Sequence, residues 1–523
     1  MKKLFRNRKG SLLLNSVILM VVLLLTGAAF LQWAADEAYQ ARFDLARTQA
    51  YYIAQKGAIE GGLSYLRSKT EVDLPRVKKT LPPTGREYFL NIGEETYTYV
   101  VDSYVDPVYY VLNSEVPENE LAAAEEFNIY ATGVVGFRQP NGETYEVERS
   151  FRLKVQKPAL SKYFYFTDSE VTEFGEIIWF YGEDDVYGPV RSNDEIGIKG
   201  SPRFYSEVIT VADDFIHGDG FAPEFNGPDP VFEADSVILS DRASELRLAA
   251  DTQGSYFDNR SGEWQTRIVA ESNGWHVMQW GAGTPFPDDG LFDNEATVPY
   301  SMNAAIFVEG TLELYGNRVK QRATIGSEGD MRLLDDIRYA DYSARDLTTE
   351  NQQDSYYMAD RGSENILGLI SESRVRIANT IENGKGNGGS TGDWSDHDNK
   401  HIIITGAIIT LGGSFDFENQ NNRPDDIYGW DGYWWCDDEG DHANDPDERG
   451  AIYLRGSVIQ KQRGYVHRSN CSGTGYDKAY AYDIRMWKTP PPYFPKETDA
   501  DGRYDFQIVS SWDQDPTRRE DFE

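Results

Sequence analysis

Cysteine is scarce in this chain, because Cys436 and Cys471 are the only two among 523 residues. There is no Cys-x-x-Cys pair and no Cys/His cluster, so the composition argues against the usual structural zinc sites. Two cysteines do not identify a cellular compartment, but outside the cytoplasm they are expected to form one disulfide. That bond would close a loop of about 35 residues and contribute on the order of 3–4 kcal/mol in the chain-entropy model.

Positive charge is also in short supply. The chain has 51 Lys and Arg against 86 Asp and Glu, a formal net charge of -35, and five of its basic residues lie within the first ten positions. The rest of the chain therefore repels nucleic acid and anionic lipid surfaces. We expect no nucleic-acid partner, and we interpret the acidic excess as a solvated surface or as adaptation to a salty or calcium-rich medium.

Recognisable catalytic motifs are lacking as well. The sequence contains no nucleophile elbow, phosphate-binding loop or zincin motif, and its six histidines are scattered. Acidic residues are so frequent that a pair of catalytic carboxylates could be chosen at many places, so no pair carries weight. The sequence predicts a protein that is not an enzyme.

Long apolar runs are limited to one, at residues 11–33. This run is long enough to cross a bilayer, which needs about 20 residues, whereas a cleaved secretory signal has an apolar region of about 7–15. The basic flank before it should stay in the cytoplasm, so the chain after Trp33 is expected outside. A signal-peptidase cut around residues 26–29 is the alternative.

The predicted helix continues past the membrane boundary, and we expect one helix over residues 11–68. A stripe of large side chains and a stripe of small ones lie beside each other at helical spacing. A glycine costs roughly 1 kcal/mol relative to alanine in a helix, so glycines in the small stripe predict a closely packed helix or sheet there. The large stripe is Leu45, Tyr52, Ile59, Leu63 and Leu66, and the small stripe is Ala46, Ala50, Ala54, Gly57, Ala58 and Gly61.

The order of these N-terminal features resembles the signal of type IV pilins and pseudopilins: a basic leader ending in Gly10, an apolar half-helix, then an amphipathic half-helix. The resemblance covers about 60 residues. It implies that prepilin peptidase cuts between Gly10 and Ser11, so that residues 1–10 are a leader. It also implies that the inner membrane and other pilin-like subunits are partners.

Asn15 departs from the pattern of the major pilins, which usually carry glutamate at the fifth position after the cut. In this respect the chain resembles the PilX-type minor pilins and the K-type pseudopilin, which are associated with filament tips or initiation. The stretch "AYYIAQKGAIEGGLSYL" also resembles PilX-like N-termini. The resemblance implies that Asn15, which cannot neutralise the amine of Ser11, marks an assembly position at the tip. The alternative is an ordinary anchor in which Asn15 faces lipid headgroups.

After the helix, the sequence predicts an α+β, mainly β protein with two further domains. Alternating segments at 87–92, 96–105, 126–137 and 144–155 indicate strands, so residues 69–160 are expected to form a small antiparallel β domain like a pilin head. Residues 161–523 carry short apolar runs separated by glycine, which favour a parallel β-solenoid over a β-sandwich. Residues 163–512 also resemble a bacterial domain of unknown function that occurs downstream of prepilin-like N-termini.

Three further clusters of residues are candidate binding sites. Two acidic stretches offer the oxygen ligands that Ca²⁺ prefers, although neither matches an EF-hand, and a solvated loop and a polar turn are the simpler interpretations. An aromatic cluster at 428–436 is either packed in the core or loops, or exposed as a platform for sugars. The candidate residues are Asp437, Asp441, Asp445 and Asp447 for the first Ca²⁺ site, Glu497, Asp499, Asp501 and Asp505 for the second, and Trp430, Trp434 and Trp435 for the sugar platform.

These observations lead to one main hypothesis and one alternative. The first is a non-enzymatic minor pilin or pilin-like subunit of a type IV filament or a secretion pseudopilus. It would be anchored in the inner membrane before assembly and displayed outside the cell afterwards, with its head in the periplasm or beyond. The alternative is a membrane-anchored surface protein that binds polysaccharide, or a carbohydrate-active enzyme built on a β-helix.

Overall fold

A computed structural model describes residues 8–81, 96–108, 124–138, 143–172, 175–182, 184–287, 289–342, 354–384, 401–418, 447–468 and 474–514. The chain divides into two compact units. Unit 1 contains residues 1–157 and 503–523, and unit 2 contains residues 158–502. A long apolar N-terminal helix is followed by a mainly β region, so the predicted α+β, mainly β class is confirmed at this level.

Unit 1 combines the long helix with a five-stranded sheet in the order β1-β2-β3-β4-β28, and all neighbouring strands are antiparallel. Three predicted strands correspond to β2, β3 and β4, whereas the expected strand at 87–92 lies outside the described residues. The elements are α1 (Arg8–Lys56), a π-helical segment (Gly57–Leu63), α2 (Ser64–Arg67), a 3-10 turn (Glu71–Asp73), β1 (Lys79–Leu81), β2 (Thr96–Val108), β3 (Glu126–Arg138), β4 (Thr144–Gln156) and β28 (Gln507–Gln514).

The C-terminal half of α1 packs against this sheet through its smallest residues. Ala50 and Ala54 of α1, and Ala58 of the π-helical segment that follows it, are fully buried. On the sheet side, Gly133 of β3 permits the contact, because a Cβ atom at Gly133 would lie 2.3 Å from the carbonyl oxygen of Ala50. The close approach expected along the small-residue stripe is therefore present, and a sheet provides it.

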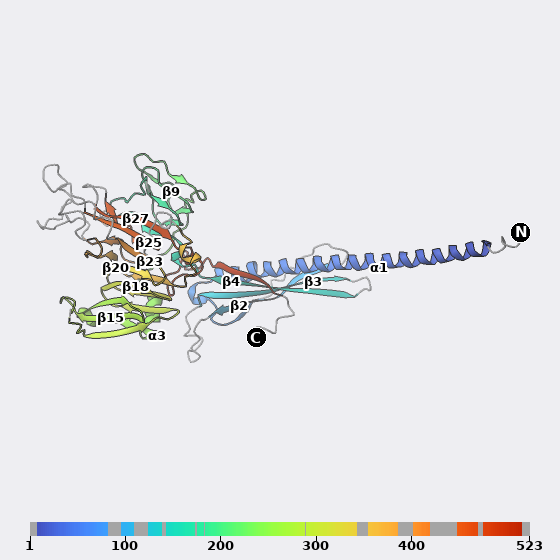
Figure 1. Cartoon of the computed structure of the whole chain (residues 1–523), viewed down its shortest axis with the longest axis horizontal. Helices are drawn as coiled ribbons and strands as arrows, with labels where there is room; N and C mark the ends of the chain where they lie inside the picture. Colours follow the sequence, from blue (N-terminus) through green and yellow to red (C-terminus); the bar gives the residue numbers. More distant parts are fainter. Residues whose placement is uncertain are drawn as a thin grey trace. The chain divides into compact units, whose positions relative to one another are not determined.

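The last strand of unit 1 comes from the far end of the sequence. β28 runs antiparallel along β4, and Figure 1 shows it as the red strand beside β4. Just before it, Phe506 is fully buried and meets Phe127 of β3 edge-on, with ring centroids 5.6 Å apart. The structure thus differs from the predicted single domain over 161–523, because residues 503–523 belong to unit 1 and unit 2 is inserted between β4 and β28.

Unit 2 consists of many short strands with little helix. Most strand pairs are parallel, and the antiparallel pairs between the described strands are β14–β15, β15–β16 and β26–β27. The elements are a 3-10 turn (Leu160–Lys162), β5 (Tyr165–Ser169), β6 (Asp185–Val186), β7 (Val190–Ser192), β8 (Gly197–Ile198), β9 (Arg203–Phe204), β10 (Val208–Thr210), β11 (Ile216–His217), β12 (Glu224–Phe225), α3 (Ser244–Gln253), β13 (Tyr256–Phe257), a 3-10 turn (Arg260–Gly262), β14 (Trp264–Ala270), β15 (Gly274–Gly281), β16 (Asn294–Pro299), β17 (Ala304–Val308), β18 (Leu312–Val319), β19 (Arg322–Ser327), β20 (Met331–Tyr339), α5 (Tyr357–Asp360), β21 (Ile366–Ser371), β22 (Val375–Ile377), β23 (Ile402–Thr410), β24 (Phe415–Phe417), β25 (Asp447–Gln462), β26 (His467–Arg468), β27 (Thr474–Tyr482) and a 3-10 turn (Ile484–Trp487).

One parallel ladder connects eight of these strands in the order β17-β19-β21-β23-β25-β5-β7-β10. In this ladder β5 pairs with β25, although all the strands from β6 to β24 lie between these two in the sequence. Seven of these strands each place one buried polar residue at the same register position, so that the seven residues form one row. That row is Ser327, Ser371, Thr410, Gln460, Thr167, Ser192 and Thr210.

Two long strands of this ladder change partners along their length. The N-terminal half of β25 pairs with β27 and its C-terminal half pairs with β5. Gly406 of β23 and Gly456 of β25 are in register at this change, with φ angles of 153° and 158°. A Cβ atom at Gly456 would lie 1.7 Å from the Gly406 carbonyl oxygen, so only glycine fits there. These glycines therefore lie inside continuous strands, where their missing side chains allow the two backbones to pair.

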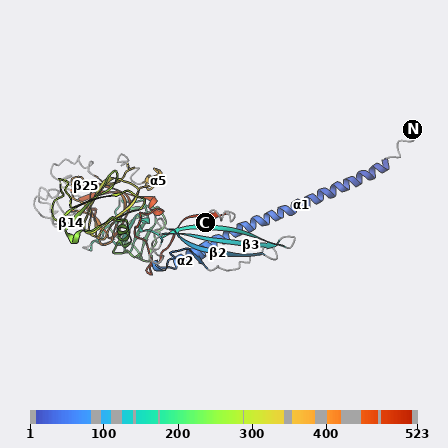
Figure 2. The same ribbon diagram turned by 90° about the horizontal axis from the view of Figure 1, so that it is seen from below.

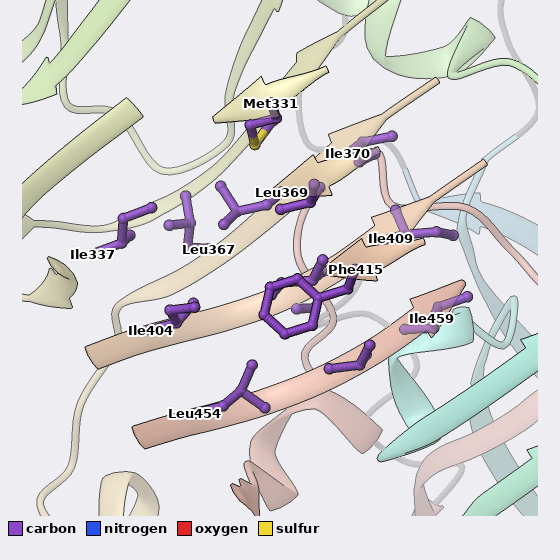
Figure 3. Close-up of a cluster of buried hydrophobic side chains, with 14 of the residues drawn as sticks. Met331, Ile337, Leu367, Leu369, Ile370, Ile404, Ile409, Phe415, Leu454 and Ile459 are labelled. Carbon is purple, nitrogen blue, oxygen red and sulfur yellow. The ribbon is translucent and has the colours of Figure 1, made fainter. Parts of the chain in front are cut away.

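The core of unit 2 is formed by aliphatic side chains from neighbouring strands. Figure 3 shows Ile370, Ile409 and Ile459 in register on successive strands of the ladder, and Phe415 in the same cluster. Three of these four side chains are completely buried, and Phe415 keeps only 2% of its surface exposed. Burying one such side chain contributes about 1.5–3 kcal/mol, so the stacked rows supply the main stabilisation of the unit.

A second set of neighbouring strands carries charges in register. Arg267, Glu313, Arg332, Arg376 and Asp416 follow one another across β14, β18, β20, β22 and β24. Glu313 accepts hydrogen bonds from both Arg267 and Arg332, and Asp416 accepts one from Arg376 at 2.9 Å. Three of the four neighbouring pairs in this row join opposite charges and stabilise the register, whereas a shift by one residue would move each charge to the other face of its strand.

Candidate functional site

The N-terminal half of α1 is the most unusual surface of the described chain. The helical stretch Leu12–Arg67 has a mean hydropathy of 2.4 over its most apolar 18-residue window, and none of that window is buried. By length and composition it could cross a membrane, as the sequence predicts. In Figure 1 and Figure 2 this part of α1 extends beyond the strands of unit 1, so no described side chain covers it.

The predicted processing and assembly residues all lie on this helix. Gly10 and Ser11 belong to the first turns of α1, so the helix continues through the expected cleavage position. Asn15 is exposed, and its neighbour Ser16 donates a hydrogen bond to the Leu13 carbonyl oxygen at 2.9 Å. The structure therefore places Asn15 on the outside of the apolar segment, where a neighbouring molecule or lipid can reach it.

Three of the five large residues continue this apolar surface along unit 1, whereas Leu63 and Leu66 are buried in its core. Leu45, Tyr52 and Ile59 are 42%, 61% and 38% exposed, whereas the neighbouring small residues are buried against the sheet. Their spacing of seven residues is the repeat with which one helix packs along another. The sheet thus leaves uncovered a seam of these three side chains on one face of the helix.

Several predicted site residues lie outside the described residues. These are both cysteines of the expected disulfide, the aromatic platform and most of the first Ca²⁺ site. Asp447 lies at the start of β25, but its side chain is not described. The undescribed residues are Cys436, Cys471, Trp430, Trp434, Trp435, Asp437, Asp441 and Asp445.

The second expected Ca²⁺ site is described, and its four carboxylates do not converge. Within the described ranges no group of three or more His, Cys, Asp or Glu side chains is placed to hold a metal ion. Glu497 instead pairs with Lys162 and accepts a hydrogen bond from Tyr163, while Asp505 of unit 1 pairs with Arg67 at 2.7 Å. Asp499 and Asp501 lie in a turn where the Asp501 amide donates to Asp499 at 2.9 Å. The stretch is therefore a polar turn, the simpler interpretation of the sequence.

Unit 2 contains a small polar cavity that the sequence did not indicate. Its volume is about 140 Å³. It is lined by residues of β5, β6 and β27, by their neighbours in the chain, and by Arg463, which directly follows β25. Its lining residues are Phe164, Tyr165, Phe180, Asp184, Asp185, Val186, Arg463, Lys478, Ala479 and Tyr480.

A buried ion pair forms one wall of this cavity. Arg463 Nη1 donates to Glu170 Oε2 at 2.7 Å, and both side chains are only 2% exposed. The guanidinium also lies over the Phe180 ring, 4.0 Å from its centroid. Burial opposes the charge of Arg463, but Glu170 more than compensates and the pKa of the guanidinium is raised. This arginine therefore remains charged next to the cavity.

Tyr480 is another lining residue, and its hydroxyl is buried and bound by no described group. Among the described residues, the buried oxygen of Tyr480 has no hydrogen-bond partner. Burial raises the pKa of Tyr480 well above its ordinary value, so the hydroxyl keeps its proton. Tyr165 differs, because its hydroxyl accepts a hydrogen bond from Gln460 at 2.7 Å. The Tyr480 hydroxyl is thus a protonated donor without an acceptor in the described structure.

The remaining polar side chains of the cavity keep contact with solvent. Lys478 Nζ lies 3.6 Å from Asp184 Oδ1, and these side chains are 32% and 22% exposed. Asp185 pairs with Arg203 at 2.5 Å. Each charge at the cavity is therefore paired with one of opposite sign. The alternation of polar and aromatic residues in β27 is the one sequence pattern that could have pointed to this cavity.

Comparisons with known proteins add little. A family model described as a domain of unknown function (DUF4900) matches residues 124–213, which include β3, β4 and the strands from β5 to β10. No curated protein and no solved structure matches the chain. The matched segment thus spans parts of both units, and its description assigns no chemistry.

Proposed function

We propose that this protein is a non-enzymatic pilin-like subunit, processed by prepilin peptidase and anchored in the inner membrane by α1 until it joins a filament or pseudopilus. The observation that carries the proposal is the division of α1 into two surfaces. Its C-terminal half is packed on the sheet of its own unit, and its N-terminal half is apolar, exposed and free of described contacts.

Two other features support this proposal. The exposed seam of Leu45, Tyr52 and Ile59 offers a surface for the helices of neighbouring subunits. The basic leader with Gly10 precedes the apolar segment in the order that prepilin peptidase substrates have. A protein that is only anchored in the lipid bilayer requires the apolar segment, but it does not require the exposed seam on unit 1.

The proposal includes a role for unit 2 as a parallel β-solenoid displayed outside the membrane. The eight-strand parallel ladder and its continuous row of buried polar side chains support this architecture, in which each coil of chain stacks on the previous one. An inserted unit of about 345 residues would crowd a thin filament if it were repeated at every position. A sparse or terminal position is therefore proposed.

The processing step is tested by the intact mass of the full chain, produced with and without a prepilin peptidase and extracted from the membrane. The expected result is loss of residues 1–10 only when the peptidase is present, with a new N-terminus at Ser11. Gly10→Trp should abolish the cleavage and leave membrane insertion unchanged. Gly27→Trp is a matched control, because a Cβ atom at Gly27 meets nothing within 4 Å, and it should be cut normally. Retention of Met1 with active peptidase, or a start near Ala29, contradicts the proposal.

The position in the filament is tested through Asn15. In the membrane an unpaired charge is expensive, so a subunit without a carboxylate at this position adds poorly beneath another subunit. Immunogold labelling of sheared filaments should therefore mark ends, and Asn15→Glu should spread the label along the shaft. Uniform labelling of the unaltered protein contradicts a tip position, and absence from all filaments favours a plain membrane anchor.

The second candidate function is a membrane-anchored protein that binds a surface polysaccharide. The polar cavity of unit 2 favours it, because aromatic rings and hydrogen-bonding groups occur together there. This function is compatible with the first, since a displayed unit can carry a binding site.

A further inference from the structure

Unit 1 is completed by a segment that the chain supplies only after the whole of unit 2. β4 ends at Gln156 and β28 begins at Gln507, so 350 residues separate two strands that are direct neighbours in the sheet. We call residues 503–514 the return segment. It can dock on unit 1 only when the two ends of this long connection come together.

The return segment is bound to unit 1 by buried and polar contacts. Phe506 is fully buried and meets Phe127 of β3 edge-on. Tyr504 donates a hydrogen bond to Glu71 Oε2 at 2.6 Å, and Lys157 donates to the same oxygen at 2.7 Å. Glu71 therefore joins the last residue before unit 2 to one of the first residues after it.

Unit 2 joins its own two ends by similar chemistry. Ala159 and Lys496 form an antiparallel bridge, with backbone hydrogen bonds of 2.9 and 2.8 Å on its two sides. Glu497 pairs with Lys162 and accepts a hydrogen bond from the Tyr163 hydroxyl at 2.9 Å. Nearly the whole of unit 2 separates the two sides of this contact in the sequence, so the contact persists only while unit 2 is folded.

Folding of unit 2 therefore shortens the loop that unit 1 must close. The effective concentration of two joined chain ends falls roughly as the −3/2 power of the number of residues between them. The flexible part of the connection is about ten residues when unit 2 holds its ends together, and it is the full 350 residues when unit 2 is unfolded. This difference lowers the equilibrium constant for docking of the return segment by roughly 200-fold.

We propose that docking of the return segment is conditional on the folding of unit 2, so that unit 1 is completed only in molecules whose unit 2 is folded. Without the return segment, β4 becomes an unpaired edge of the sheet, and such an edge is a template for pairing with other chains. The state of unit 2 is thereby reported on the surface of unit 1. The inference depends on neither leader cleavage nor filament assembly.

The coupling is tested in the full chain, in detergent, by hydrogen exchange read by mass spectrometry. Unit 2 is unfolded by Gly456→Val or, as a second route, by Ile409→Asp, which buries an unpaired charge in the core shown in Figure 3. Loss of protection in β21 and β23 verifies the unfolding. In that state the protection of β28 should fall by roughly 200-fold, while the amides that join β2 to β3 stay protected.

A removable cross-link distinguishes loop closure from any other influence of unit 2. Ala159 and Lys496 are an antiparallel pair without mutual hydrogen bonds, a geometry with Cα atoms about 4.5 Å apart that suits a disulfide. Ala159→Cys and Lys496→Cys are combined with Gly456→Val in a chain that carries serine in place of Cys436 and Cys471. Oxidation at low protein concentration leaves a loop of about 14 residues, so it should restore the protection of β28 by roughly 100-fold, and reduction should remove it again.

Ala159→Cys without the second new cysteine is the matched control, and oxidation should leave its β28 protection unchanged. Undiminished protection of β28 with unit 2 unfolded overturns the proposal. A loss that oxidation does not reverse also overturns it, because the closeness of the two ends is then not the cause. Joint loss of protection in β28 and in the β2–β3 pair shows that unit 1 unfolds as a whole, which contradicts conditional docking. Failure of leader cleavage or of filament assembly leaves all these measurements unchanged.

Discussion

Unit 1 and unit 2 are both built mainly from strands, but the strands that pair are related differently in sequence in the two units. In unit 1, β2, β3 and β4 follow one another in the sequence and pair as antiparallel neighbours. In unit 2, neighbours in the ladder are parallel and come from distant segments, as β5 beside β25 shows most clearly. Antiparallel neighbours can be joined by a short turn, whereas parallel neighbours need a crossover. Local sequence patterns are therefore informative about unit 1 and much less so about the pairing in unit 2.

The two units also use glycine differently. Gly133 in unit 1 lets a helix approach a sheet, and a Cβ atom there would meet the Ala50 carbonyl oxygen at 2.3 Å. Gly456 in unit 2 lets two paired strands approach each other, and a Cβ atom there would meet another backbone oxygen at 1.7 Å. A helix can shift slightly on a sheet, but the strands of a parallel ladder are fixed on both sides. Substitution of Gly456 is accordingly expected to be the more damaging.

The largest effect is expected for Gly456→Val. The new side chain collides with the Gly406 carbonyl oxygen, and valine does not adopt a φ near 158° without strain. We expect unit 2 to lose at least about 4 kcal/mol of unfolding free energy, the range of severe core disruptions. Hydrogen exchange read by mass spectrometry should show loss of protection in β23, β25 and β5, with β2 to β4 still protected. Equal loss of protection in both units would contradict their independence.

Two phenylalanines only twelve positions apart provide a sharper comparison. Phe506 and Phe494 are both fully buried, but the first belongs to unit 1 and the second to unit 2. Each change to alanine should cost about 3–5 kcal/mol. Phe506→Ala should reduce hydrogen-exchange protection in β3 and β4, and Phe494→Ala should reduce it in the ladder of unit 2. If both variants affected the same unit, the C-terminal segment would not return to unit 1.

The next prediction compares the stability cost of breaking a buried ion pair with that of breaking an exposed ion pair of the same length. Arg463 and Glu170 lie 2.7 Å apart and are 2% exposed, whereas Arg67 and Asp505 lie 2.7 Å apart and are 45% and 79% exposed. Glu170→Gln should destabilise unit 2 by about 3–5 kcal/mol, because it leaves a buried cation without its counterion. Asp505→Asn should change unit 1 by at most about 1 kcal/mol. Denaturant unfolding followed by hydrogen exchange measures both, and similar costs would refute the assigned burial.

The smallest effect is a gain in stability with a defined pH dependence. Burial raises the pKa of Asp336 from 3.8 to about 6, against the hydrogen bond from the Ile403 amide and the nearby Arg338. An acid with a raised folded-state pKa favours folding fully below its unfolded pKa and loses this contribution as the pH rises through about 6. Asp336→Asn should therefore stabilise unit 2 at pH 7–8 by up to roughly 3 kcal/mol, and much less at pH 4.

Thermal unfolding of Asp336→Asn across this pH range is the measurement. Glu418→Gln, directly after β24, is the comparison, because the pKa of Glu418 is shifted in the opposite direction. Burial would raise the pKa of Glu418, but hydrogen bonds from Arg332 and the Asn379 amide lower it below its ordinary value. Its contribution is present above the unfolded pKa and is lost as the pH falls through the lower folded value, so Glu418→Gln should destabilise the unit at neutral pH. A stabilising effect of both changes at pH 7 would contradict these assignments.

Several features follow from the sequence because they depend on local pattern. The apolar run fixes a helix long enough to cross a membrane, and the alternation of residues 126–137 and 144–155 indicates β3 and β4. The alanines of the small stripe predict a close contact, and Ala50 and Ala54 are indeed buried. Each of these signals reports which face of an element is buried, and that depends on residues three or four apart in a helix and two apart in a strand.

Other features were decided only by the tertiary structure. Nothing local shows that residues 507–514 return to β4, that β5 lies beside β25, or that Gly406 meets Gly456. Periodicity reports burial but not the identity of the partner, and a parallel pair has no connecting turn that would reveal it. The residues of the polar cavity come from segments nearly three hundred positions apart, such as Tyr165 and Arg463. Their meeting depends on the stacking of the whole ladder, which no single segment encodes.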